Sequence, residues 1–288
     1  MAGKQERQRK RARERYERQR QERLDRRRKV QRWSGIGLAV LLVGGLVAGL
    51  TVAFAGGSPK SSAAAKSTAT ATASPSATPS ASTVAEPAHH CTYTKAGTAA
   101  KAVSLPPAAP DYKAAYQATI NTNRGKIKIN LLNSKATCTV NSFIHLADAG
   151  FWNSSQCHRI SDSEGLYMLQ CGDPTAKASE KLSCSSTTLG TGTPGYEFAS
   201  ENLTGATYKA GTVAMANSGT SDSNGSQFFL VFKNTDLPAD YTPFGTITSG
   251  LDILQNVAKA GTSCTFPQAG GGVPKEKVII NSVTIKQV

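Results

Sequence analysis

The sequence predicts a mostly β domain, an antiparallel barrel with two helices, preceded by a single transmembrane helix and a disordered linker. Three observations support this. Residues 33–57 are apolar and carry no charge, residues 58–110 are rich in Ser, Ala, Thr and Pro, and residues 111–288 alternate short apolar runs with glycine-rich turns. Only 39% of the 288 residues are hydrophobic and 7% are aromatic, so we expect part of the chain to remain unfolded.

The positive charge is concentrated in a basic tail. Residues 1–32 contain 15 Lys and Arg and 5 Asp and Glu, a net charge of +10, whereas the rest of the chain carries only +4. A folded nucleic-acid-binding domain would carry its positive charge on its own surface, so no nucleic-acid partner is expected. We interpret residues 1–32 as a cytoplasmic topology signal that also touches lipid headgroups. Contact with nucleic acid or with anionic lipid is the alternative.

The apolar segment 33–57 is long enough to cross a membrane. Its central 20 residues, 36–55, would span about 30 Å as a helix, which matches the hydrocarbon layer. The preceding basic tail predicts a single-pass cell-membrane protein with a cytoplasmic N-terminus and an extracytoplasmic C-terminal domain. A cleaved signal peptide is the alternative, because Ala53-Phe54-Ala55 resembles a cleavage site. The apolar run exceeds the roughly 7–15 residues of a signal core, however.

The linker, residues 58–110, has too little apolar surface to bury a core. We interpret it as a flexible spacer, interrupted only by a small segment around Cys91. The folded body is expected to begin near Asp111 and to occupy residues 111–288 as one domain.

Hydrophobic periodicity predicts the elements of this domain in order. Apolar stripes predict helices over 137–149 and 251–259, which end at Gly150 and Gly261. Alternation predicts the strands, and Asn123-Arg124-Gly125 is typical of the turn between the first two. The predicted strands are 116–121, 126–132, 158–160, 166–170, 211–216, 227–232, 244–247 and 278–286.

The common catalytic patterns are not found. The sequence contains no Gly-x-Ser-x-Gly elbow. His89-His90-Cys91 resembles a metal-binding corner but lacks a second pair at ligand spacing, so no metal is expected. The glycine-rich segments 190–192 and 270–272 do not lead into a Lys-Ser/Thr helix start, so neither predicts a phosphate site. No cofactor is expected, and a reaction without a nucleophile or proton relay has to be considered.

Three segments together carry a functional signal. They are Cys157-His158-Arg159-Ile160, then Tyr167-Met168-Leu169-Gln170-Cys171-Gly172-Asp173, then Met215-Ala216-Asn217-Ser218-Gly219 with Asn224-Gly225-Ser226-Gln227-Phe228-Phe229. Their order and spacing resemble the cyclophilins, which are barrel-shaped peptidyl-prolyl cis–trans isomerases, over about 112–288. The resemblance implies an eight-stranded antiparallel barrel capped by two helices, with the site on its outer face. It also implies an isomerase that assists folding of proline-containing polypeptides, here outside the cytoplasmic membrane.

The resemblance also implies roles for single residues. Arg159 matches the key catalytic residue, which would stabilise the twisted imide without covalent chemistry, and Gln170 would support it. The residues implied to bind the proline ring or the peptide backbone are Tyr167, Met168, Gly190, Ala216, Asn217, Ser218, Gln227, Phe229, Leu237 and Tyr241.

Some positions depart from the family pattern. Leu237 stands where a Trp is usual, and Tyr241 stands in place of a His that closes the pocket wall. The pocket is therefore altered, which puts cyclosporin affinity in doubt but not isomerase activity. A long insertion, 176–189, carries Cys184. The protein is expected to be monomeric.

A non-catalytic proline-binding or chaperone module tethered to the membrane is the alternative function. Retention of Arg159 and Gln170 disfavours it, because binding alone would tolerate their loss.

The six cysteines are expected to form disulfides. All lie at or beyond Cys91, on the side predicted to be extracytoplasmic. Six cysteines allow 15 pairings. Cys157 and Cys171 flank a predicted hairpin and could face each other, with Cys138 the next candidate partner for either. Three cysteines lie outside the regular barrel, where a disulfide would close a long loop: Cys91, Cys184 and Cys264.

Overall fold

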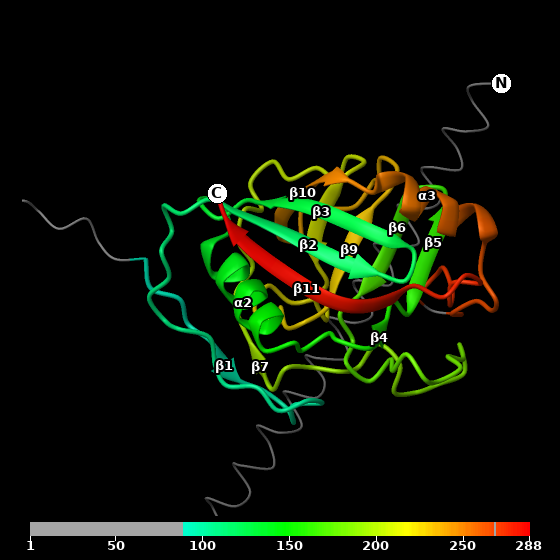
Figure 1. Ribbon diagram of the computed structural model, residues 1–288, viewed down its shortest axis with the longest axis horizontal. Helices are drawn as coiled ribbons and strands as arrows, with labels where there is room; N and C mark the ends of the chain where they lie inside the picture. The colour runs from blue at the N-terminus through cyan, green and yellow to red at the C-terminus, as the bar shows by residue number, and fades with distance from the viewer. Residues whose placement is uncertain (1–88, 268) are drawn as a thin grey trace, which may run out of the picture. The chain divides into compact units, whose positions relative to one another are not determined.

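The computed structural model of the protein describes residues 89–267 and 269–288 (Figure 1). The predicted tail, the predicted span and the first part of the predicted linker, residues 58–88, lie outside these residues. Among the residues that the structure describes, no helix combines the length and apolar character needed to cross a bilayer.

The main element is a nine-stranded sheet in which every neighbouring pair is antiparallel (Figure 1). In sheet order its strands are β4 (Ser155–Gln156), β11 (Ile279–Gln287), β2 (Tyr116–Thr122), β3 (Gly125–Leu131), β10 (Pro243–Ser249), β8 (Thr212–Met215), β9 (Phe228–Val231), β6 (Leu166–Cys171) and β5 (Arg159–Ser163). A separate two-stranded sheet pairs β1 (Thr94–Lys95) with β7 (Tyr196–Glu197).

The nine-stranded sheet curls because its two edge strands come from one short segment. Only Cys157 and His158 separate β4 from β5, yet β4 pairs with β11 and β5 pairs with β6. The predicted mostly β, antiparallel fold with two helices is confirmed. The strand count is nine rather than eight because the bend at residues 157–158 divides this segment into two strands.

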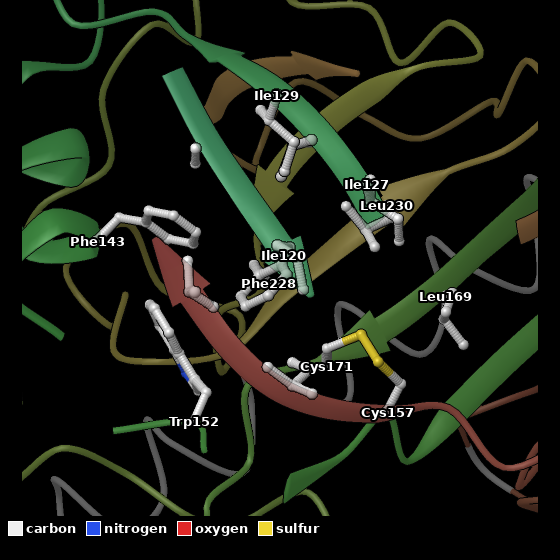
Figure 2. Packing of buried hydrophobic residues seen from close by; sticks show 14 of the residues in the cluster. Ile120, Ile127, Ile129, Phe143, Trp152, Cys157, Leu169, Cys171, Phe228 and Leu230 are labelled. Atoms are coloured by element: carbon white, nitrogen blue, oxygen red, sulfur yellow. A yellow bond between two sulfur atoms is a disulfide. The ribbon is translucent and has the colours of Figure 1, made fainter. Parts of the chain in front are cut away.

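Both helices pack against the main hydrophobic core of the curled sheet. They are α2 (Thr137–Asp148) and α3 (Leu251–Ala260), and their predicted positions are confirmed to within a residue at each end. From α2, the ring of Phe143 lies 4.8 Å from that of Trp152 and 5.6 Å from that of Phe228 (Figure 2). These aromatic contacts tie the helix to β9 and form the centre of the main core.

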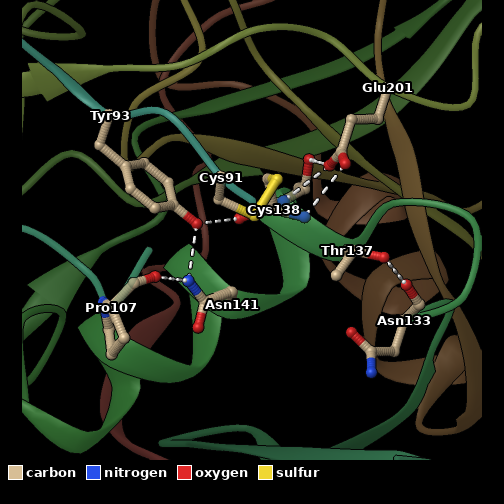
Figure 3. The surroundings of a disulfide bond; sticks show 9 residues. Cys91, Tyr93, Pro107, Asn133, Thr137, Cys138, Asn141 and Glu201 are labelled. Atoms are coloured by element: carbon tan, nitrogen blue, oxygen red, sulfur yellow. Dashed lines mark hydrogen bonds between the residues drawn. A yellow bond between two sulfur atoms is a disulfide. The ribbon is translucent and has the colours of Figure 1, made fainter. Parts of the chain in front are cut away.

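The strap, which we define as residues 89–110, lies on the folded domain although the sequence assigned it to the linker. Cys91 is buried and bonded to Cys138 at the start of α2 (Figure 3). The Tyr93 hydroxyl donates to the Cys138 carbonyl at 2.8 Å and accepts from Asn141, and burial raises its pKa. The folded domain therefore extends at least to residue 89, because a disulfide and hydrogen bonds hold a segment poor in apolar side chains.

The three disulfides pair all six cysteines. Cys157 bonds to Cys171, as the hairpin argument suggested, and this disulfide is surrounded by buried apolar side chains (Figure 2). The other two are Cys91–Cys138 and Cys184–Cys264.

Candidate active site

Strand alternation separates the predicted site residues from the main core. Across β5, β6 and β9, Arg159 lies opposite Gln170, and Gln170 lies opposite Phe229. The next row, which includes Leu169 and Leu230, points into the main core. Because successive side chains on a strand point to opposite faces, Arg159, Gln170 and Phe229 share the outer face of the sheet.

Arg159 is partly buried and held at three points. Its Nη1 donates to Gln170 Oε1 at 3.0 Å, its Nε donates to the Gly270 carbonyl at 2.9 Å, and its Nη2 donates to the Ala269 carbonyl. Loss of hydration lowers the pKa of the guanidinium, and the nearby Tyr241 opposes that shift. An arginine keeps its charge in such surroundings, since its ordinary pKa lies above 12. The site therefore contains an oriented, permanently charged donor.

Gln170 and Gln227 form an amide relay behind the arginine. Gln170 accepts from Arg159 and donates from Nε2 to Gln227 Oε1 at 3.0 Å. Gln227 Nε2 in turn donates to the carbonyls of Gly190 and Gly192 at 2.9 and 3.0 Å. Each amide thus has both ends engaged, which fixes its rotamer and, through it, the guanidinium plane.

An apolar group, which we call the outer cluster, adjoins this relay. Its buried members are Met168, Tyr208, Ala214, Phe229 and Val231. Ala216, Leu237 and Tyr241 pack against it, and the Tyr241 ring meets the Phe229 ring edge-on with centroids 5.6 Å apart. The two residues that depart from the family pattern therefore both lie here. An apolar surface beside a cationic donor can receive a proline ring and leave its imide nitrogen next to the guanidinium.

The segment after β8 borders the outer cluster. The Ala216 N–H donates to the Gln227 carbonyl at 2.9 Å, and Asn217 Nδ2 donates to the Asp240 carbonyl at 2.8 Å. Ser218 is exposed, and its N–H donates to Ser223 Oγ at 3.0 Å. These bonds fix the segment beside Gln227, a member of the relay.

Comparison with known proteins gives the family. Residues 117–285, more than half of the chain, match the family model described as cyclophilin type peptidyl-prolyl cis-trans isomerase/CLD. The chain belongs to this family. In the part of the chain that the structure describes, no group of three or more His, Cys, Asp or Glu could hold a metal ion.

The similar proteins include two mycobacterial relatives. "Probable peptidyl-prolyl cis-trans isomerase B" of Mycobacterium leprae is 41% identical over 214 residues, covering 68% of this chain and 66% of the relative. The protein of the same name from Mycobacterium tuberculosis is 40% identical over 205 residues, covering 65% and 60%. The chain therefore matches less than two thirds of the length of either relative. A Cryptosporidium parvum cyclophilin-type isomerase structure aligns with a TM-score of 0.48 at 24% identity, covering 60% of this chain and 98% of that one.

Of the predicted site residues of this cyclophilin-type domain, Tyr167 is not brought together with the others, whereas Gly190 joins the amide relay through its backbone. Tyr167 faces away from the outer cluster, because it precedes Met168 on the same strand and so points to the other face. Its ring instead packs 6.3 Å from that of Phe232, with Lys233 Nζ 4.4 Å above it. Gly190 acts through its backbone: its carbonyl holds Gln227, and its N–H donates to Asp173 Oδ2 at 2.5 Å.

Other residues of the site were not predicted. Tyr208 joins the outer cluster from an irregular segment, where no periodicity could indicate its direction. Ala269 and Gly270 contribute only carbonyl oxygens, which every residue has. No sequence signal could have identified them as ligands of Arg159.

Proposed function

We propose that this domain catalyses cis–trans isomerisation of X–Pro peptide bonds in polypeptides, with Arg159 as the catalytic donor. The proposal rests on the position of the Arg159 guanidinium, which the amide relay holds beside the outer cluster on the outer face of the sheet. The family and the names of the relatives support the same activity.

The reaction poses an electrostatic problem rather than a covalent one. Rotation about a peptide bond meets a barrier of about 18–20 kcal/mol because twisting destroys amide resonance. The two end states of an X–Pro bond differ by only about 0.5–1 kcal/mol, so an enzyme has only to lower the barrier. In the twisted state the imide nitrogen regains a lone pair and can accept a hydrogen bond. A donor that bonds this nitrogen only in the twisted state accelerates rotation.

Arg159 has donors left for this purpose. A guanidinium carries five N–H groups, and the bonds to Gln170, Ala269 and Gly270 use three. The two that remain belong to Nη1 and Nη2. Because the guanidinium is already held in place, reorienting it costs little when the substrate twists.

The test is the loss of activity in Arg159→Ala, measured on the full-length chain purified in detergent with a protease-coupled assay on a proline-containing peptide. We expect kcat/KM to fall about 100-fold or more, the range seen when a single transition-state donor is removed. Arg124→Ala is the matched control, since Arg124 makes a salt bridge to Glu276 on the surface, and it should keep full activity. Full activity in a folded Arg159→Ala protein contradicts the mechanism. Peptide binding without acceleration by the wild type supports the non-catalytic module instead.

We further propose that the domain acts outside the cytoplasmic membrane, tethered through residues 33–57. The uncharged apolar segment behind a tail of charge +10 supports this orientation. Three disulfides also support it, because disulfides persist in oxidising compartments. Protease added to intact cells should remove the folded domain. Protection of the domain in intact cells, or its recovery as a released protein, contradicts the tether.

A further inference from the structure

Arg159 has a second support that the amide relay does not explain. This support is the loop after α3, described for residues 261–267 and 269–274. We propose that the Cys184–Cys264 disulfide is a positioning element for Arg159, because it fixes the loop whose carbonyls orient the guanidinium. The proposal rests on the function proposed for Arg159 and adds a determinant of turnover from outside the strands of the site.

The loop holds one edge of the guanidinium. Nε and Nη2 lie on the same edge of the planar group, and they donate to the carbonyls of Gly270 and Ala269. Gln170 holds the group from Nη1. A planar group held only by Gln170 could still turn about that one bond, whereas the added loop contacts fix its plane.

A run of glycines lets the loop approach the strand that carries Arg159. Gly271 has a φ of 66°, and a Cβ there would lie 2.3 Å from the Ile160 carbonyl oxygen. Gly272 and Ile160 exchange backbone hydrogen bonds in both directions, each 2.8 Å. The glycine-rich segment 270–272, which carries no phosphate-site signature, therefore serves close backbone packing beside the site.

The disulfide fastens this loop to the long insertion. A Cβ on Gly272 would lie 1.7 Å from the Cys264 carbonyl oxygen, so Cys264 lies directly against the glycine run. Cys264 bonds to Cys184 in the insertion 176–189, and the Cys184 N–H points at the Cys264 sulfur, 3.2 Å away.

The insertion is itself fixed to the sheet. Gln156 on β4 is buried, and its Nε2 donates to the carbonyls of Lys177 and Glu180 at 2.5 and 2.9 Å. A continuous path therefore runs from β4 through the insertion and the disulfide to the loop, and from the loop back to Arg159 on β5. Opening the disulfide interrupts this path and leaves the strand pairing of Arg159 unchanged.

The experiment compares two disulfide deletions in the full-length chain. Cys184→Ser with Cys264→Ser is the test variant, and Cys91→Ser with Cys138→Ser is the matched control. The control disulfide lies at the start of α2, on the opposite side of the molecule from the loop after α3 (Figure 1). For both variants kcat and KM are measured with the proline-containing peptide, together with the midpoint of urea unfolding. The Arg159 Nε–H resonance is followed by NMR as a direct readout of its bond to Gly270.

We expect the test variant to lose about tenfold in kcat with KM unchanged, since small misplacements of a reacting group cost up to about 100-fold. Its Arg159 Nε–H should exchange faster with water. The control variant should lose stability but keep kcat and the resonance. Gly271→Ala is a second probe, because its Cβ would displace the loop from Ile160, and it should lower kcat in the same way.

Equal kcat in the test variant and the wild type, with an unchanged resonance, overturns the proposal. So does a fall in kcat that is the same in both deletions and follows their loss of stability. A wild type that does not accelerate isomerisation refutes the proposed function instead, and the resonance of Arg159 then decides by itself whether the disulfide positions the guanidinium.

Discussion

The two faces of the curled sheet use the same strands for different purposes. The inner face packs into a main core that draws on both helices and on most of the strands. The outer cluster has only five buried members, and beside it the amide relay and Arg159 supply polar groups. The difference shows that alternation along a strand lets one short sequence specify a stable core and a chemical surface together.

Phe228 and Phe229 offer the most direct test of the difference between the two faces, because they are neighbours on β9 and their side chains point to opposite faces. Phe228→Ala should lower the free energy of unfolding by about 3–5 kcal/mol, since it opens a cavity beside Phe143 and Trp152. Phe229→Ala should cost about 1–3 kcal/mol, because the outer cluster is small, and should raise KM for the peptide. Urea unfolding and steady-state kinetics measure both effects. Equal losses of stability with an unchanged KM would show that the two faces are not distinct.

Substitution of Gln170 tests the chemical role of the outer face, as distinct from its contribution to stability. Gln170→Ala should lower kcat about 10- to 100-fold because it releases the guanidinium at Nη1, while stability changes by less than about 1 kcal/mol. Gln117→Ala is the control, since Gln117 makes a similar amide bond to Asn130 on the far strands β2 and β3. A kinetic effect as large in Gln117→Ala would contradict a specific role for the relay.

His158 lies at the bend where the two edges of the sheet meet, and it predicts a pH dependence of stability. Burial lowers its pKa to about 4, against an ordinary 6.5; Asp173 opposes the shift and Arg159 adds to it. Between about pH 6.5 and 4 the unfolded chain binds a proton that the folded chain excludes, so the free energy of unfolding falls as the pH falls. From pH 7 to pH 5 the contribution is about 1–2 kcal/mol. Urea midpoints at both pH values should show a smaller difference in His158→Gln than in the wild type and in His145→Gln. An unchanged difference in His158→Gln would exclude His158 as the cause.

Much of the fold could be predicted because hydrophobic periodicity can be recognised in any helix or strand that is several residues long. The two helices and the long strands each contain enough residues to show a repeat, and they were found within a few residues of their observed ends. β1, β4 and β7 have two residues each, too few for any alternation. The strap was missed because the partner of Cys91 could not be chosen among the possible pairings from sequence.

The parts of the site formed by side chains of recognisable motifs could be predicted, whereas the parts formed by backbone carbonyls could not. Arg159, Gln170 and Phe229 come from recognisable motifs, and strand pairing places them in one row. Tyr167 shows the opposite case: a motif places it beside Met168, but adjacent residues of one strand cannot share a face. The carbonyls of Ala269 and Gly270 depend on a loop conformation that glycine spacing alone does not specify.

The three disulfides also decide how the domain responds to a mechanical load. A force applied between residue 89 and the C-terminal strand passes through each sulfur–sulfur bond and bypasses the residues that the bond encloses. The enclosed stretches are 92–137, 158–170 and 185–263, and they contain every strand of the nine-stranded sheet except β4, β11 and the last residue of β6. Under such a force the load therefore falls on the pairing of β11 with β4 and with β2. The strands that carry Arg159, Gln170 and Phe229 lie in the bypassed stretches and do not bear the load.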